Sequence, residues 1–207
     1  MFYLDLFRTL EEEKVRYLLV GSLAANLHGG ELSTMNVDLM PAFDAENLQR
    51  FFNVAKRLRL KPAAPVTLEQ FFEVETWSSD ERMSGFSLRS SDGLAPSIDV
   101  LVKPAVLFEP AYERRAMMRL GEVTIDVAAS EDLVALKSGA SHLDRYEYEL
   151  TDEQLLYYSS LPAAAKLQRL DEARQFTLLA REARIAVDHG GAPTREPSAP
   201  RGPRRAC

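Results

Sequence analysis

The feature that most constrains this chain is an aspartate inside an apolar strand pattern, shortly after a Gly-Ser turn. The apolar run Tyr17–Val20 ends at Gly21-Ser22, and after thirteen intervening residues the chain reads Asn36-Val37-Asp38-Leu39. Alternation along a strand directs Asn36 and Asp38 to one face and their apolar neighbours to the other. An aspartate in such a strand is unfavourable without a ligand or partner. The pattern therefore predicts a sheet that carries a polar site on one face.

A second aspartate, Asp99, has the same setting, because Ile98 and Val100 flank it in a strand expected over residues 97–102. Carboxylates are hard oxygen ligands for Mg²⁺, and the backbone and hydroxyl donors of a Gly-Ser turn suit a phosphate. Chemistry that transfers a nucleotide needs both kinds of group close together. Asn36 can offer a cation only a neutral amide oxygen, so we expect weaker metal binding than three carboxylates would give.

The remaining periodicity predicts alternating helices and strands. Helices are expected over residues 3–13, 23–28, 45–60, 108–114 and from 130, and strands over 15–20, 36–40, 83–88, 97–102, 117–120 and 123–127. Beyond Leu150 the pattern is helical only, with an amphipathic stretch over 167–187. The predicted fold class is therefore α/β (α+β), a mixed sheet flanked by helices with a C-terminal helical segment.

The predicted organisation is one domain with two appendages. Residues 1–150 are expected to form the sheet domain, 151–188 a helical extension and 189–207 a disordered tail, because that tail repeats Gly, Pro and Arg with almost no apolar content. The single cysteine, Cys207, excludes an intrachain disulfide and favours a reducing cytoplasm. Charges interrupt the apolar N-terminus too early for a secretory core or a membrane span.

Composition also limits the classes of function. A formal net charge of −6 argues against a protein whose main function is to bind duplex nucleic acid independently of sequence. Two basic clusters remain candidates for local patches, one around Arg57, Arg59 and Lys61 and one around Arg114, Arg115 and Arg119. The three histidines lack metal spacing, so zinc is not expected. Ser22 lacks the Gly-x-Ser-x-Gly elbow, which argues against acyl transfer.

These motifs resemble the signature of the nucleotidyltransferase (DNA polymerase beta-like) superfamily. Residues 10–39 are similar to bacterial toxin-like nucleotidyltransferases related to the AbiEii abortive-infection family and to uncharacterised relatives. The matching residues are Leu19-Val20-Gly21-Ser22, His28-Gly29, Ser33-Thr34 and Asn36-Val37-Asp38-Leu39. Downstream, the run from Ala129 to Lys137 resembles the helix that delivers a phosphate-facing lysine in that family. The resemblance implies a nucleoside triphosphate (NTP) as substrate and Mg²⁺ as cofactor.

Three polar positions depart from the family pattern. Leu32 stands where arginine is common, Asn36 replaces the first carboxylate, and His142 takes the place of a second arginine. All three departures fall on polar site positions while the apolar framework is kept. This distribution suggests a conserved fold with an eroded site.

Two functions remain open at this stage, beside an unrelated α/β module. The first is a nucleotidyltransferase in which Asp38 and Asp99 bind Mg²⁺ with help from Asn36. In that enzyme Gly21, Ser22 and Lys137 bind the triphosphate, and the acceptor hydroxyl belongs to protein, RNA or a small molecule. The second is a catalytically impaired descendant, a pseudoenzyme that serves as a nucleotide-binding or protein-interaction module in a toxin-antitoxin type system. Neither requires a membrane.

Overall fold

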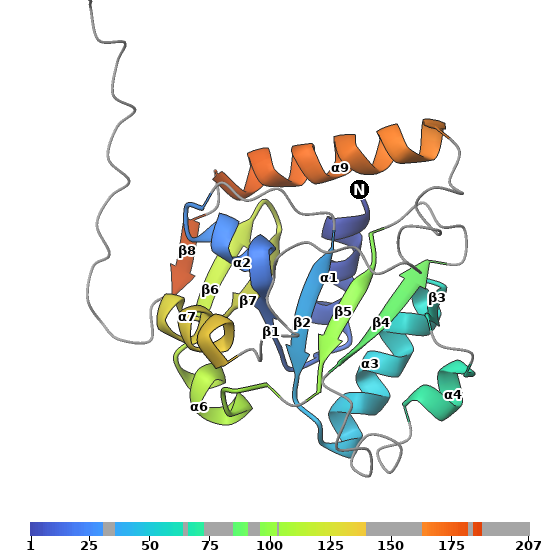
Figure 1. Cartoon of the computed structure of the whole chain (residues 1–207), viewed down its shortest axis with the longest axis horizontal. Coiled ribbons are helices and arrows are strands. Elements are labelled where there is room, and N and C mark those ends of the chain that lie inside the picture. Colours follow the sequence, from blue (N-terminus) through green and yellow to red (C-terminus); the bar gives the residue numbers. More distant parts are fainter. Residues whose placement is uncertain are drawn as a thin grey trace, which may run out of the picture.

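The computed structural model describes residues 1–30, 36–63, 66–72, 85–90, 96–102, 104–139, 163–181 and 184–187. Helices and strands alternate along most of this length, as the periodicity predicts (Figure 1). In chain order they are α1 (Phe2–Glu12), β1 (Tyr17–Val20), α2 (Gly21–Leu27), β2 (Val37–Pro41), α3 (Ala45–Arg57), β3 (Leu60–Pro62), α4 (Leu68–Phe71), β4 (Gly85–Ser90), β5 (Ile98–Leu101), α6 (Phe108–Glu113), β6 (Ala116–Leu120), β7 (Val123–Val127), α7 (Ser130–Gly139), α9 (Ala163–Arg181) and β8 (Arg184–Val187).

The described strands form one mixed sheet in the order β3-β4-β5-β2-β1-β7-β6-β8. The central strand β1 runs antiparallel to β2 and parallel to β7, and β2 runs parallel to β5. Antiparallel pairs complete both edges, including the β6–β7 hairpin that the Gly121-Glu122 break predicts. The α/β fold class, a mixed sheet flanked by helices, is therefore confirmed.

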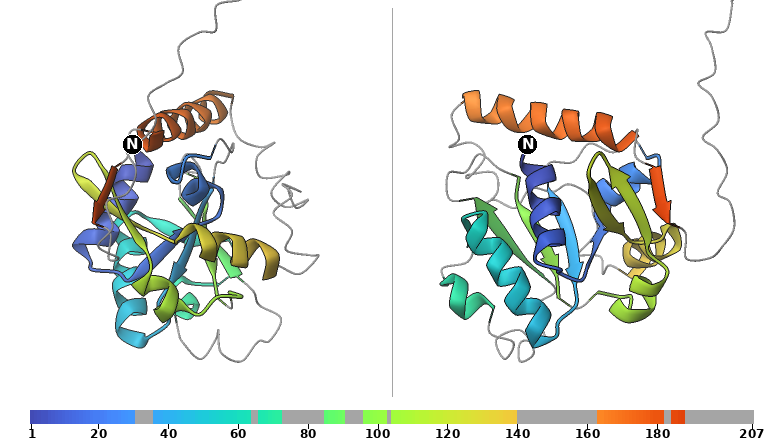
Figure 2. Two further views of the ribbon diagram at one scale, coloured as in Figure 1. Left: turned by 90° about the vertical axis from the view of Figure 1, so that its left-hand side faces the viewer. Right: turned by 180° about the vertical axis from the view of Figure 1, so that it is seen from behind.

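Helices cover the two faces of the sheet separately (Figure 2). On one face, Leu19 of β1 joins the main core with apolar residues of α1 and α3 such as Phe7 and Phe51. On the other face, Val20 joins a smaller cluster with Leu136 of α7. Alternation along β1 explains the division, since successive side chains point to opposite faces.

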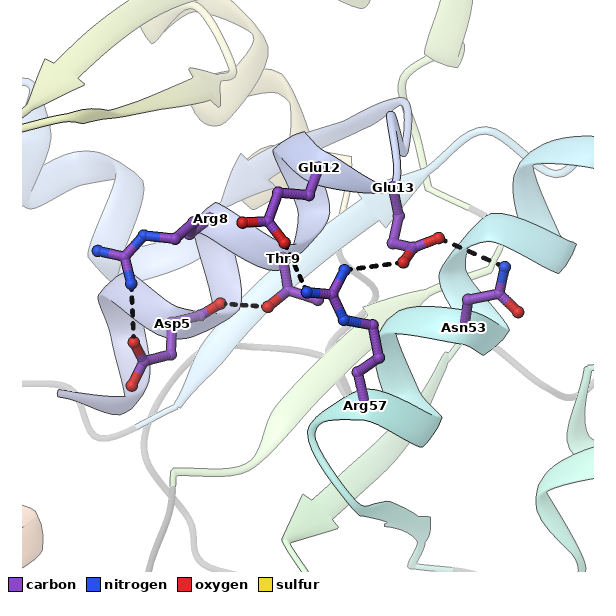
Figure 3. A network of polar contacts seen from close by, with 7 residues as sticks. All are labelled: Asp5, Arg8, Thr9, Glu12, Glu13, Asn53 and Arg57. Carbon is purple, nitrogen blue, oxygen red and sulfur yellow. Dashed lines mark hydrogen bonds and ion pairs between the residues drawn. The ribbon is translucent and has the colours of Figure 1, made fainter.

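Polar contacts attach α3 to the strands and to α1. The side chain of Asn47 in α3 accepts a hydrogen bond from the Arg16 backbone amide at 2.7 Å and donates to the carbonyl of Ala42 at 2.9 Å. Arg57 near the end of α3 donates to Glu12 at 2.5 Å and to Glu13 at 2.8 Å (Figure 3). One member of the first basic cluster is therefore neutralised on the α1–α3 side of the sheet.

The C-terminal segment differs in part from its predicted form. The expected amphipathic helix over 167–187 ends at Arg181, and residues Arg184–Val187 form β8, which pairs antiparallel with β6. The helix expected over 45–60 is also shorter than predicted, since α3 ends at Arg57 and Leu60 begins the unexpected strand β3. The edge positions of β3 and β8 explain both differences, because short edge strands depend on a partner strand more than on their own pattern. Residues 189–207 lie outside the described part.

Helix α9 shares a core with the N-terminal helix. Phe176 is 0% exposed, and its ring centroid lies 4.7 Å from that of Tyr3 and 6.0 Å from that of Phe7. Figure 1 shows α9 lying across the end of the sheet where the chain begins. Among the described residues, no helix is both long and apolar enough to cross a membrane.

Truncation of Phe176 tests how much α9 contributes to stability. Phe176→Ala should lower the free energy of unfolding by about 3–5 kcal/mol, because it removes a fully buried ring. Urea denaturation followed by circular dichroism measures the change. The matched control on the same helix is Leu170→Ala, where the side chain is 55% exposed and the expected change is within about 0.5 kcal/mol. Equal losses for the two variants would contradict the packing described.

Candidate functional site

The two predicted aspartates are neighbours on the sheet. Asp38 of β2 lies directly opposite Asp99 of β5 in the parallel pair, and it also lies opposite Val20 of β1. Residues in register on adjacent strands project to the same face, from backbones about 5 Å apart. Both carboxyl groups therefore lie on the face that carries Val20, opposite the α1–α3 core. Residues 61 positions apart in sequence are thus brought side by side by the strand order.

Asp38 is a buried carboxyl group whose environment opposes its charge. Its side chain accepts no hydrogen bond from any described residue, and the residue is only 7% exposed. Burial and the nearby negative charge of Asp99 raise the pKa of Asp38 to about 8. A strongly shifted carboxyl with a like-charged neighbour is typical of a functional site.

Asp99 accepts hydrogen bonds from two donors, one on the neighbouring strand β4 and one directly before β2. The hydroxyl of Ser87 in β4 donates to Oδ1 at 2.5 Å, and the amide Nδ2 of Asn36 donates to Oδ2 at 3.0 Å. Burial raises the pKa of Asp99, while these two hydrogen bonds and the charge of Arg89 oppose the rise. The carboxylate is therefore oriented from both sides before any ligand arrives.

Asn36, at the position where the resemblance implies a carboxylate, lies beside the pair. Its Oδ1 accepts a hydrogen bond from the hydroxyl of Ser97 at 2.8 Å, while its Nδ2 donates to Asp99. In this arrangement the amide presents a donor to Asp99, where a third carboxylate would present an acceptor. Within the described residues, no group of three or more His, Cys, Asp or Glu side chains could hold a metal ion. The site offers two carboxylates and one amide.

The Gly-Ser turn lies against this pair. Gly21 has φ +68°, a conformation that favours glycine. A Cβ atom at Gly21 would lie 2.1 Å from Oδ2 of Asp38, so a side chain there could not coexist with the carboxyl group in its present position. Gly21 therefore does two things, since it permits the turn from β1 into α2 and leaves room for Asp38.

Ser22 and Lys137 have different relations to the acid pair. Ser22 directly follows Gly21 at the start of α2 and is half-buried. Lys137 is exposed on α7, a helix that covers the same sheet face through Leu136. The described contacts do not bring Lys137 to Asp38 or Asp99.

Other residues singled out in the sequence have structural partners or fall outside the described part. The Nε2 atom of His28 lies 2.8 Å from the carbonyl oxygen of Ala128, a contact that ties the end of α2 to the residue after β7. Leu32, Ser33, Thr34 and His142 lie outside the described residues.

The second basic cluster is largely neutralised by acidic residues. Arg114 donates to Asp132 at 2.6 Å, and Arg115 donates to Asp126 at 2.9 Å. These pairs attach α6 and its following turn to α7 and β7. They fit the interpretation of the cluster as structural surface charge rather than as a nucleic-acid patch.

Sequence reasoning missed the two serines of the site. Ser87 and Ser97 bond to Asp99 and Asn36, yet each is a single hydroxyl in a common context. The available signal was the alternation of the strand around residue 88, which separates Ser87 from the buried Leu88. Only the register between β4 and β5, which aligns Ser87 with Asp99, turns that alternation into a contact.

Comparisons with known proteins find likeness among solved structures alone. Neither a scan against protein-family models nor a search of curated proteins finds a match. Among solved structures, the chain is similar to the solution structure of the antibiotic-resistance factor ANT(2'')-Ia, with a TM-score of 0.42 and 11% sequence identity. The alignment covers 86% of this chain and 92% of that chain. The function proposed below rests on the geometry of the site.

Substitution of Gly21 tests its contact with Asp38. Gly21→Ala and Gly121→Ala both place a side chain at positive φ, but a Cβ at Gly121 meets nothing within 4 Å. We expect Gly121→Ala to lower the free energy of unfolding by about 1 kcal/mol. Gly21→Ala should lower it by about 1–3 kcal/mol more, because the new Cβ atom also clashes with Asp38. Chemical denaturation gives both values. The extra destabilisation by Gly21→Ala should shrink in a background that carries Asp38→Ala, because the clashing carboxyl group is gone. If the extra destabilisation is unchanged there, the contact with Asp38 is not its cause.

The raised pKa of Asp38 predicts a pH-dependent stability. Between the ordinary value of 3.8 and about 8, the folded protein keeps a proton that the unfolded chain releases, so stability falls as pH rises through this window. Asp38→Asn removes the titrating group. In EDTA, the difference in free energy of unfolding between the variant and wild type should shift in favour of the variant by at least about 1 kcal/mol as the pH rises from 5 to 8. Thermal denaturation at several pH values measures this gain.

The control for that experiment is an exposed carboxylate elsewhere. Asp171 lies on α9 with a 57% exposed side chain, so Asp171→Asn should leave the pH dependence of stability as in wild type. Parallel pH curves for wild type and Asp38→Asn would show that Asp38 does not carry the shift.

Proposed function

We propose that this protein is a nucleotidyltransferase that transfers a nucleoside monophosphate from an NTP to a hydroxyl acceptor with Mg²⁺. The single observation that carries the proposal is the register that sets Asp38 beside Asp99 on one sheet face, with the Gly21 turn in contact with Asp38. Nucleotide transfer needs acidic groups next to a phosphate-binding turn. The motif order in the sequence supports the same function.

The donor set fits a hard divalent cation. Two carboxylates from adjacent strands and one amide supply oxygen ligands of the kind that Mg²⁺ prefers. Asp38 has no other described partner, which leaves its carboxyl group available to a cation. When bound, Mg²⁺ would neutralise phosphate charge and lower the pKa of a coordinated hydroxyl group.

Each residue of the site has a proposed role. Asp38 and Asp99 bind the cation, and Asn36 contributes an amide oxygen after its side chain rotates away from Asp99. The backbone of Gly21 and the hydroxyl of Ser22 bind the phosphates. Lys137 faces the phosphate charge from α7, a role that rests on the resemblance alone.

A second candidate function is favoured by the orientation of Asn36. An amide donor directed at Asp99 and held by Ser97 stabilises the pair without a cation, and the site lacks the charge of a third carboxylate. These features suit a pseudo-nucleotidyltransferase that binds nucleotide, or a protein partner in a toxin-antitoxin type system, without turnover. The acceptor of an active enzyme, whether protein, RNA or a small molecule, is left open by the same residues.

Release of pyrophosphate tests the proposal without knowledge of the acceptor. The protein is incubated with Mg²⁺ and each of the four NTPs labelled at the α-phosphate, and both pyrophosphate and label transfer are measured. If wild type is active, Asp38→Asn should lower the rate by at least about a hundredfold, because it removes a charged metal ligand. Asp171→Asn is the matched control and should keep the wild-type rate.

Restoring the carboxylate separates the two candidate functions. Binding of Mn²⁺, a paramagnetic substitute for Mg²⁺, should be tighter in Asn36→Asp by about tenfold or more, because a third charge joins the site. Activity in Asn36→Asp but not in wild type would support the pseudoenzyme. If neither protein binds Mn²⁺ or NTP, both the enzyme and the nucleotide-binding form of the pseudoenzyme are wrong.

A further inference from the structure

Two basic residues share the sheet face of the acid pair. Ser87 of β4 donates a hydrogen bond to Asp99, so its side chain lies on the face of the acid pair. Arg89 is two positions further along β4 and therefore lies on the same face. Lys61 of β3 lies directly opposite Arg89 in the antiparallel pair. Their neighbours Leu60 and Leu88 belong to the core on the other face, as the alternation of both strands requires.

The same register places Arg89 and Lys61 toward the end of the sheet at which β5 begins. Strand β4 runs antiparallel to β5, so the step from Ser87 to Arg89 leads toward Ser97, which precedes β5. Asn36 lies at that end, since it bonds to Ser97. Gly21 also follows β1 there, beyond the pair formed by Val20 and Asp38. The acid pair is therefore flanked by the Gly-Ser turn on one side and by the basic residues on the other.

Charge and exposure support a role in binding. Arg89 lies on the sheet face of Asp99, two positions beyond Ser87, whose hydroxyl donates to that carboxylate. Lys61 is exposed and forms no ion pair with an acidic residue of the described chain. Unlike Lys61, the residues Arg57, Arg114 and Arg115 are each held by acidic partners.

We propose that Arg89 and Lys61 form a polyphosphate subsite beside Asp38 and Asp99, which binds the phosphates of the NTP on the β4–β3 side. This proposal rests on the function proposed above and adds the direction in which the bound phosphate chain extends. The phosphate chain extends from the Gly21-Ser22 turn across the acid pair toward the edge of the sheet. Guanidinium and ammonium groups are the common protein partners of phosphate oxygens. In a chain of net charge −6, such a local concentration of positive charge is what an anionic substrate requires.

Binding of inorganic tripolyphosphate and of ATP by the full chain tests the subsite. Titration calorimetry is done at pH 7 and low salt, first in EDTA and then in Mg²⁺. Arg89→Gln should weaken tripolyphosphate binding about tenfold in both conditions, and Lys61→Gln about threefold, since the lysine is more exposed. Arg89→Lys should restore most of the affinity because it keeps the charge. Arg8→Gln on α1, at the opposite face, is the matched control and should bind as wild type does.

The outcomes distinguish this subsite from the metal-dependent function. Tripolyphosphate binding in EDTA that is lost in Arg89→Gln but kept in Asp38→Asn supports the subsite even if no transfer activity is found. Equal affinities in wild type, Arg89→Gln and Lys61→Gln overturn the subsite even if the enzyme is active. Because Lys61 is exposed at an edge strand, Lys61→Gln should fold normally and keeps the test valid if Arg89→Gln does not fold. Circular dichroism of each variant confirms the fold.

Discussion

The structure depends on how a buried carboxyl group is accommodated beside a glycine. Asp38 lies in a central strand, where its charge is opposed by burial and by Asp99. It fits only because Gly21 carries no side chain, since a Cβ would come within 2.1 Å of its Oδ2 atom. Such a buried charge costs stability unless a partner compensates it. The site and the turn are therefore one structural unit.

The two faces of the sheet carry different kinds of residue. The face under α1 and α3 is continuous apolar packing, extended by Phe176 of α9. The opposite face carries the acid pair, Ser87 and Arg89 on β2, β5 and β4. Alternation along each strand allows this, because one strand can supply core and site at once.

Much of this arrangement could be predicted from the sequence. The strands around Asp38 and Asp99 were predicted because apolar neighbours flank each aspartate, and the β6–β7 hairpin because Gly121-Glu122 separates two apolar runs. Edge strands β3 and β8 were missed, since three or four residues carry too little pattern to be distinguished from a loop or a helix end. Serine hydroxyls were missed for a related reason, because their importance depends entirely on which strand lies next to them.

The sequence alone determined the local elements, the alternation that aims Asn36 and Asp38 to one face, and the position of the turn at Gly21-Ser22. Only the tertiary structure decided that β2 and β5 are parallel neighbours in a register that pairs Asp38 with Asp99. It also decided that the amide of Asn36 faces Asp99 and that Arg89 lies on the same face. Local pattern reflects the periodicity of one segment, whereas strand order and register depend on long-range packing of all segments together.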